Sequence, residues 1–359
     1  MTRVTGVTRA LAVTMLVNAL MCCLLQPVVA AESPSELNIS IAVFDPGVPA
    51  DRSLHRDLQV FPRIREIEAL FLPFVLRETL AATSHWGAVR VVPEPDNAAE
   101  LLISGTIVRS DGVTLELQLR AVDASGHVWL DKHYTGVAPY GYEQSDAGSG
   151  LSGYQQLYDE IAADLLLART GLDDKGLADI VEISLLRYAN QLAPTAFEDY
   201  LHTAADGTFT LNRLPAENDP MLERIHRIRG VEYVMTDAVD AKFQELHTEI
   251  ASTYDLWREY RREYAQYQIE EATRLQNSRV DAPRGSFEAM QNHYENYKWD
   301  RLAAQEQEKW AVGFDNEVSP TVMKMESRVA ELDGWVEQNY EEWQRLLAEI
   351  FSLETSLAE

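Results

Sequence analysis

Apolar residues take every second position from Val113 to Leu119, and polar residues stand between them: Val113, Leu115, Leu117 and Leu119 against Thr114, Glu116 and Gln118. A period of two is typical of a β-strand with one buried face. Residues 101–108 are apolar and β-branched enough for a more deeply buried strand, and residues 127–135 predict a third. Turn-forming residues fill 109–112 and 123–126 between them. Residues 100–136 are therefore expected to form three consecutive antiparallel strands.

The segment before this meander changes period twice. Residues 37–44 predict a strand that ends at Asp45-Pro46-Gly47. Between 63 and 84 the apolar residues recur at helical spacing, and Pro73 is expected to kink or split that helix. Residues 88–92 predict a second strand. A strand, helix and strand in this order indicate a parallel pair with a right-handed crossover, so we expect a helix packed on a mixed sheet.

Several phrases of this region carry a resemblance to a known family. They are IAVF at 41–44, WGAVRVVP at 86–93, LLISGTI at 101–107 and LRAVDASGHVWLDK at 119–132. With this layout, residues 36–138 resemble the amino-terminal domain of TolB, a type of periplasmic α/β domain also found in CsgG and in the lipoproteins that activate penicillin-binding proteins. The resemblance implies a cell-envelope protein that acts through protein contacts. The helical region that follows replaces the propeller repeats of TolB.

The rest of the chain predicts helices almost throughout. Residues 139–153 are rich in Gly, Ser and Tyr and predict a linker, after which 154–359 is expected to be an acidic helical bundle. In the last helix, steps of four and three predict a coiled-coil seam with these members: Val322, Met325, Val329, Leu332, Val336, Asn339, Trp343, Leu346, Ile350, Leu353 and Leu357. Helices from Val239 and from Ser286 to Phe314 complete the predicted bundle, whose seam closes within one chain or between two copies. The expected fold class is α+β.

The first 31 residues have the order of a secretory signal peptide. Arg3 and Arg9 precede an apolar run at 10–25, and small residues end at Ala31. We expect an exported, periplasmic protein, with association to the outer membrane left open. Both cysteines lie in this segment, but Met21 before Cys22 does not fit a lipoprotein signal. A lipid anchor is therefore not expected, and the mature chain would contain no cysteine.

The charge balance narrows the classes of partner. The chain has 57 acidic against 31 basic residues, a formal net charge of −26. A surface this acidic repels nucleic acid and anionic lipid, so neither is an expected partner. No later apolar run is long enough to cross a bilayer, so no transmembrane segment is expected once the signal peptide is removed.

Candidate chemistry is sparse. The eight histidines form no metal-binding motif, and neither a phosphate loop nor a nucleophile elbow occurs, so no cofactor and no catalytic residue is predicted. The weak metal candidate is His127, Asp131 and His133, which even spacing would place on one strand face. It supports the alternative hypothesis, a secreted hydrolase or metal-dependent enzyme with a site near that strand.

Aromatic and arginine side chains gather in one helix, and these residue types favour protein interfaces. They are Trp257, Arg258, Tyr260, Arg261, Tyr264 and Tyr267. Two interpretations remain: a surface for a partner protein, or a packed seam of the bundle. The sequence as a whole favours a non-catalytic protein-binding or scaffolding component of the cell envelope.

Overall fold

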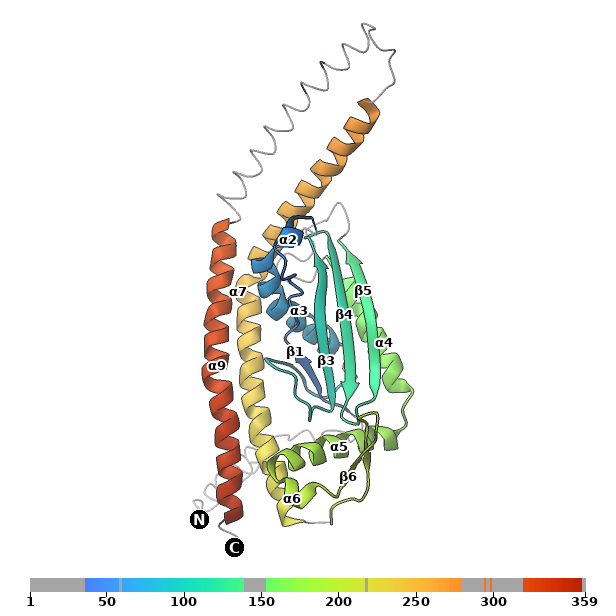
Figure 1. Ribbon diagram of the computed structural model, residues 1–359, viewed down its shortest axis with the longest axis vertical. Helices are drawn as coiled ribbons and strands as arrows, with labels where there is room; N and C mark the ends of the chain where they lie inside the picture. Colours follow the sequence, from blue (N-terminus) through green and yellow to red (C-terminus); the bar gives the residue numbers. More distant parts are fainter. Residues whose placement is uncertain are drawn as a thin grey trace, which may run out of the picture. The chain divides into compact units, whose positions relative to one another are not determined.

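The structure is a computed structural model (Figure 1), which describes residues 36–57, 60–138, 153–216, 219–278, 294, 298 and 319–356. Its centre is a five-stranded sheet in the order β2-β1-β3-β4-β5, with the following bounds: β1 Ile39–Ala42, β2 Val89–Val92, β3 Leu101–Ser110, β4 Thr114–Asp123 and β5 Val128–Val137. The first strand pairs in parallel with both β2 and β3, and the remaining pairs are antiparallel. The mixed sheet and the helices around it make an α+β fold, as predicted.

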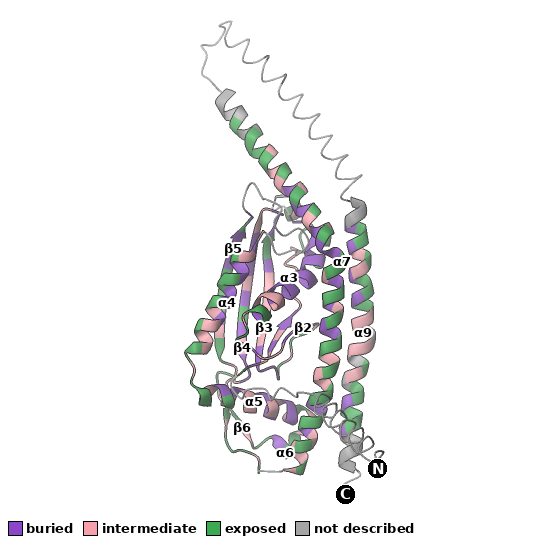
Figure 2. Cartoon of the chain, turned by 180° about the vertical axis from the view of Figure 1, so that it is seen from behind, coloured by how far each residue is buried: buried purple, intermediate pink, exposed green. Residues whose placement is uncertain are grey.

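One side of the sheet is covered by helices. Leu115, Leu117 and Leu119 of β4 point to this side and are fully buried. They pack under α3 (Pro62–Ala82) and α4 (Gln155–Thr170), which lie side by side behind the strands in Figure 1. Helix α3 also contacts α7 (Pro220–Ser278) and α9 (Ser319–Ser356), so it is buried nearly all round, as the purple residues of Figure 2 show.

Of the two expected effects of Pro73, a kink or a split, the split does not occur, because α3 is continuous through the proline. A proline inside a helix leaves the carbonyl four residues earlier without its usual donor. Here that carbonyl belongs to Ala69, and the backbone N–H of Phe44 donates to it at 3.0 Å. The chain leaving β1 thus supplies the missing bond, and α3 continues through the proline from 62 to 82.

The β2 edge of the sheet is sealed by α7. Asp240 is buried, and its Oδ1 accepts a hydrogen bond of 2.8 Å from the backbone N–H of Val91. Its other oxygen lies 2.9 Å from the guanidinium of Arg77 on α3. Next to it, Arg90 pairs with Asp237 and lies over the ring of Tyr233. Side chains of α7 therefore take the place of a further strand.

The predicted boundary at 139–153 separates segments that share a core. A single cluster of buried apolar residues runs from Leu37 and Phe71 through Tyr158 to Phe243 and Leu332. It joins the sheet, α3 and α4 to α7 and α9. The helices after the boundary pack on the α/β layer as well as on one another. The signal peptide predicted at 1–31 and the linker predicted at 139–153, except for Gly153, lie outside the described residues.

The buried stripe of α9 matches the predicted seam at first and then departs from it. Val322, Met325, Val329 and Leu332 are buried, and Val336, Asn339 and Trp343 are partly buried. Leu346 and Ile350 are exposed, and Leu347 and Phe351 are buried in their place. Steps of four after Trp343 follow a straight helix, whose period is longer than the heptad's 3.5 residues. Leu353 and Leu357 lie outside the residues whose side chains are described.

Smaller elements complete the fold. Helix α2 (Ser53–Asp57) precedes α3, while α5 (Asp174–Leu192) and α6 (Pro194–Phe197) follow α4. A hairpin of β6 (Leu201–Thr203) and β7 (Phe209–Leu211) lies within the region that was expected to be a helical bundle. The predicted helix at 286–314 lies outside the described residues except for Tyr294 and Lys298, both helical. None of the helices in the described ranges is long and apolar enough to cross a membrane.

Candidate functional site

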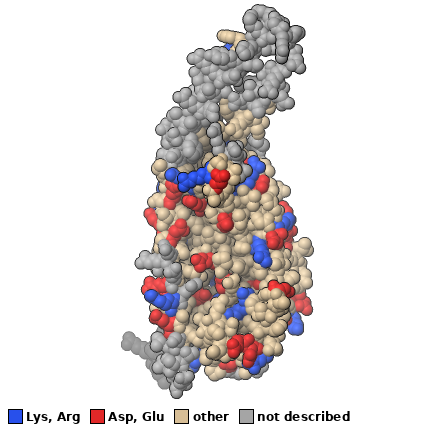
Figure 3. Space-filling model, viewed as in Figure 1, with Lys and Arg blue, Asp and Glu red and all other residues tan. Residues whose placement is uncertain are grey.

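The side of the sheet opposite α3 and α4 is exposed, and we call it the open face. Along β3, β4 and β5 its residues are partly or fully exposed, and no described helix or strand lies over them. At β1 and β2 the same side is covered, since Ala42 and Val92 are buried and Ser40 lines a pocket with residues of α7 and α9. The members of the open face are Leu102, Ser104, Thr106, Glu116, Gln118, Arg120, Asp131, His133, Thr135 and Val137. Figure 3 views the molecule from this side and shows charges of both signs scattered among uncharged side chains. The open face is thus a mixed, mostly polar surface on a rigid sheet.

The predicted metal candidate is not assembled. Val128 pairs with Val122 while Leu130 pairs with Ala121, so one extra residue enters β5 between His127 and Asp131. This β-bulge breaks the even spacing on which the prediction rested. Asp131 accepts a hydrogen bond of 2.7 Å from Gln118, and His133 lies 3.4 Å from Glu116. Within the described residues, no three His, Cys, Asp or Glu side chains are placed to hold a metal ion.

The phrase VDASGHVW, which contributes to the family resemblance, forms a hydrogen-bonded turn. The Oδ1 atom of Asp123 accepts from the backbone N–H groups of Ser125 and His127, and its Oδ2 accepts from the indole of Trp129 at 2.7 Å. Gly126 takes a φ of +84°, a conformation that favours glycine. These residues fix the β4–β5 hairpin, so their role in the fold is structural.

The aromatic and arginine group of α7 mostly packs inside the molecule. Trp257, Arg258 and Arg261 are at most 8% exposed, whereas Tyr260, Tyr264 and Tyr267 are partly exposed. Trp257 meets the edge of Phe61, and the guanidinium of Arg258 lies 4.3 Å from the ring centroid of Tyr154. Of the two interpretations, packing holds for the three buried residues. Their partners lie at the start of α3, at the start of α4 and in the β3–β4 turn, where Arg261 donates to the carbonyl of Asp111.

A buried polar cluster lies where α3, α4, β3 and α7 meet. At its centre is Glu68, whose side chain is 0% exposed. Its Oε1 accepts hydrogen bonds from the hydroxyls of Ser110 at 2.5 Å and Tyr254 at 2.7 Å. Arg65 donates to the backbone carbonyl of Ile107 at 2.6 Å. Residues far apart in the chain are thereby joined: Glu68 and Tyr254 are 186 positions apart.

Burial sets the ionisation of this cluster. It raises the pKa of Glu68, while the hydrogen bonds from Ser110 and Tyr254 oppose the rise. It also raises the pKa of Tyr154 to about 12 and that of Tyr254 well above its ordinary value. Arg258 stabilises the carboxylate of Glu68 electrostatically. The second oxygen, Oε2, is buried without a hydrogen-bond partner among the described residues. The arrangement is suited to holding α7 in one position, since a buried charge tolerates few alternative packings.

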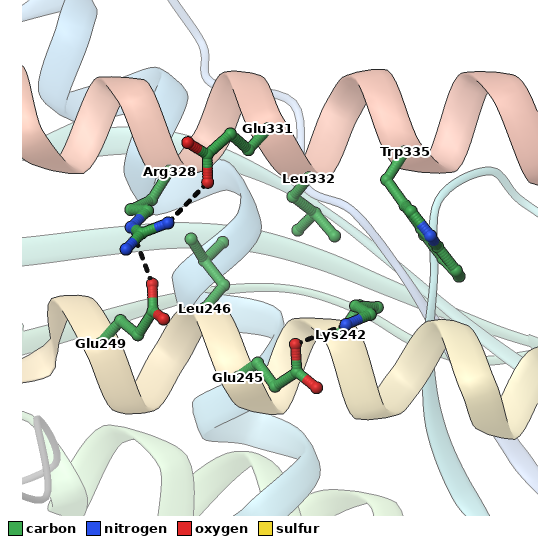
Figure 4. Close-up of a pocket in the computed structure, with 8 residues that line it drawn as sticks. All are labelled: Lys242, Glu245, Leu246, Glu249, Arg328, Glu331, Leu332 and Trp335. Carbon is green, nitrogen blue, oxygen red and sulfur yellow. Dashed lines mark hydrogen bonds and ion pairs between the residues drawn. The ribbon is translucent and has the colours of Figure 1, made fainter.

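The groove between α7 and α9, shown in Figure 4, has a volume of about 190 Å³. Its charged side chains pair with one another: Arg328 lies 3.0 Å from Glu249 and 2.6 Å from Glu331, and Lys242 lies 2.6 Å from Glu245. Leu246, Leu332 and Trp335 form the apolar part of its lining. Of these pairs, Arg328–Glu249 connects the two helices, and the other two lie within one helix each. The lining presents no convergent set of reactive groups.

A second, smaller pocket lies beside β1 and β2, between the sheet and α7. Arg229 of α7 is 7% exposed, donates to the carbonyl of Ala98 and pairs with Glu232 and Asp96. The ring of Tyr188 lies against its guanidinium. These partners anchor the start of α7 to the loop before β3.

Comparisons with known proteins give no family for this chain. A scan against protein-family models and a search of curated proteins each return no match.

Sequence reasoning missed the residues that attach α7 to the α/β layer. Glu68 and Asp240 are acidic residues of helices, and in a chain this acidic they resemble ordinary surface positions. One signal was present for Glu68, because it precedes the uninterrupted apolar run 69–76. A helix that is apolar all round is buried on every side, so a charged residue beside that run is a candidate for burial.

Proposed function

We propose that this chain is an exported cell-envelope protein that acts as a non-catalytic protein-binding or scaffolding component, with the open face as its principal contact surface. The observation that carries the proposal is the contrast between the two sides of the sheet. One side packs under α3 and α4, and the other is partly exposed along β3 and β4 and exposed along β5.

Rigidity supports the proposal. Every strand of the sheet is anchored to covering helices by buried residues, and the β2 edge is fixed to α7 through Asp240. A surface built on strands that do not rearrange loses little conformational entropy on binding. The mixed polar composition of the open face is also close to that of ordinary non-obligate protein interfaces.

Export and an envelope location rest on sequence. The signal-like order of residues 1–31 supports export. The resemblance of 36–138 to the TolB amino-terminal type of domain supports action through protein contacts. Both supports are independent of the open face, so the proposal joins three separate observations.

The test is affinity capture of the tagged, full-length chain from cells after chemical cross-linking, with mass spectrometry of the partners and of the mature amino terminus. We expect envelope proteins in the capture and a terminus near Ala31. Thr106→Arg, at the centre of the open face, should lose these partners, whereas Ala348→Arg on exposed α9 should retain them. An uncleaved amino terminus, or equal capture by both variants, would contradict the proposal.

A further inference from the structure

The two edges of the sheet differ, and the difference concerns β5. At the β2 edge, Asp240 accepts the hydrogen bond of an outward backbone N–H. At the β5 edge, no described residue beyond β4 forms a backbone hydrogen bond with Val128–Val137. Unsealed edge strands accept further strands. This strand has ten residues and contains no proline.

The ladder shows which backbone groups of β5 point outward. The backbone N–H of Ala138, directly after β5, donates to the carbonyl of Val113, directly before β4. Alternate residues of an antiparallel strand bond to the same neighbour, so residues 136, 134 and 132 also face β4. The N–H and C=O groups of Asp131, His133, Thr135 and Val137 therefore point away from the sheet. All four of these residues are exposed.

The surface beside this edge is acidic. Lys132 of β5 lies 2.8 Å from both Glu160 and Asp164 of α4, which shows that these carboxylates flank the edge. Leu167 is three positions after Asp164, on the same flank of α4, and is 72% exposed. The hydrogen bond from Lys132 lowers the pKa of Asp164, which keeps this carboxylate ionised. With Asp131 on the opposite face, where Arg120 is its neighbour across the ladder, the edge has three carboxylates against the two cations Lys132 and Arg120.

We propose that β5 is a β-augmentation site that receives an extended, basic segment of a partner protein, with alternate side chains over α4 and over the open face. This inference rests on the proposed function and names its partner chemistry. Side chains on the α4 side of an added strand would meet Glu160, Asp164 and the apolar Leu167, which favours lysine or arginine with an apolar neighbour. A second copy of this chain is disfavoured as the occupant, because each copy carries a formal net charge of −26.

The test uses the full-length chain and two ten-residue peptides, one alternating lysine with valine and one alternating glutamate with valine. We expect the lysine peptide to bind and to slow hydrogen exchange at the outward amides of His133, Thr135 and Val137. The glutamate peptide should not bind. Equal binding of both peptides, or protection spread over other strands, would overturn the proposal.

Two variants locate the site. Thr135→Pro removes one outward N–H and no ladder bond to β4. It should therefore lower the affinity for the lysine peptide by about tenfold or more, with little change in unfolding temperature. Thr135→Ala keeps that N–H and should bind as the parent chain does. Glu160→Gln should lower the affinity for the lysine peptide and leave the unfolding temperature unchanged. Undiminished peptide binding by both Thr135→Pro and Glu160→Gln would contradict the assignment.

Capture from cells distinguishes a failure of the β5 assignment from a failure of the proposed function. If Thr135→Pro captures the same envelope partners from cells as the parent chain, the β5 assignment fails while the protein-binding function stands. If neither chain captures a partner, the function itself fails. A dimer of the parent chain that Thr135→Pro abolishes would show that a second copy occupies the edge, and it would overturn the basic partner.

Discussion

The two sides of the five-stranded sheet use the same strands for different purposes. On β4, Leu115, Leu117 and Leu119 face α3 and α4 and are 0% exposed, while Glu116 and Gln118 between them face solvent. The covered side is fixed by packing, because any change of volume or charge there disturbs several helices at once. The open side carries no such constraint. Its residues are free to serve recognition, which makes it the part of the sheet where function is expected.

The largest expected difference separates neighbours on β4. Leu117→Asp places an unpaired charge in the core and should lower the free energy of unfolding by about 4 kcal/mol or more, or prevent folding. Gln118→Asp, one position away on the open face, should change it by less than about 1 kcal/mol. Urea unfolding of both variants measures this contrast. Similar losses would show that the open face is covered.

Variants of Glu68 test whether the buried polar cluster holds α7 against the helices that cover the sheet. Glu68→Ala removes the acceptor of Ser110 and Tyr254 and should cost about 3 kcal/mol. Glu68→Gln keeps the shape and should cost clearly less. Unfolding is measured by far-UV circular dichroism, which follows all the helices, and by tryptophan fluorescence, to which Trp257 contributes as one of seven tryptophans. A neutral Glu68→Ala would show that the cluster does not hold the helix.

The pH dependence of the same site has a definite sign. Because burial raises the pKa of Glu68, the folded chain binds more protons than the unfolded chain above about pH 4.5. The contribution of Glu68 to stability therefore falls as pH rises from 4.5 through the raised pKa. Glu68→Gln lacks this dependence, so its stability relative to the parent should increase over that window. A constant difference between the two chains would contradict the assignment.

Two leucines of α9, one buried and one exposed, form a matched pair of test positions. Leu332 is 6% exposed and Leu346 is 38% exposed. Leu332→Asp should therefore cost roughly 2–3 kcal/mol and Leu346→Asp less than about 1 kcal/mol. A strict heptad seam would make the two losses equal. Thermal unfolding of both variants distinguishes the straight helix from the coiled coil.

The smallest expected effect comes from His247 on α7. Its ring stacks on Phe71 of α3 at 4.6 Å between centroids and lies tilted against Phe74 at 4.9 Å, and burial lowers its pKa from 6.5. Below pH 6.5 the unfolded chain takes up the proton first, so stability is lost as pH falls through 6.5 toward the lowered pKa. His247→Gln should remove roughly 1 kcal/mol or less of this loss. Stability curves of the two chains that run parallel from pH 7 to 5 would exclude the effect.

The local patterns of the α/β layer were sufficient to predict its elements. Alternation at 113–119 identified β4, helical spacing at 63–84 identified α3, and the order of strand, helix and strand identified the parallel pairing of β1 and β2. Features that depend on distant partners were not predicted correctly. Pro73 is tolerated because Phe44 supplies a donor, and the bulge near Val128 displaces His127 from the face of Asp131. No pattern within a helix or strand contains that information.

For the helices after the sheet, the sequence predicted even less about packing partners. Apolar spacing identified α7 and α9 as amphipathic helices, but it could not show what their apolar sides meet. Trp257 and Arg258 pack against α3 and α4, so residues that the sequence offered as a partner surface are mostly internal. The open face, in turn, was missed because its polar residues are what an exposed strand face ordinarily contains.

Site-specific photo-cross-linking in cells can show whether the open face binds a protein. A photoreactive amino acid is placed at Gln118 on the open face in one chain and at Ala348 on exposed α9 in another. The account predicts a discrete adduct with an envelope protein from position 118 and none from position 348. Adducts from 348 alone, or from neither position in an exported and folded chain, would contradict the claim that the open face binds a protein.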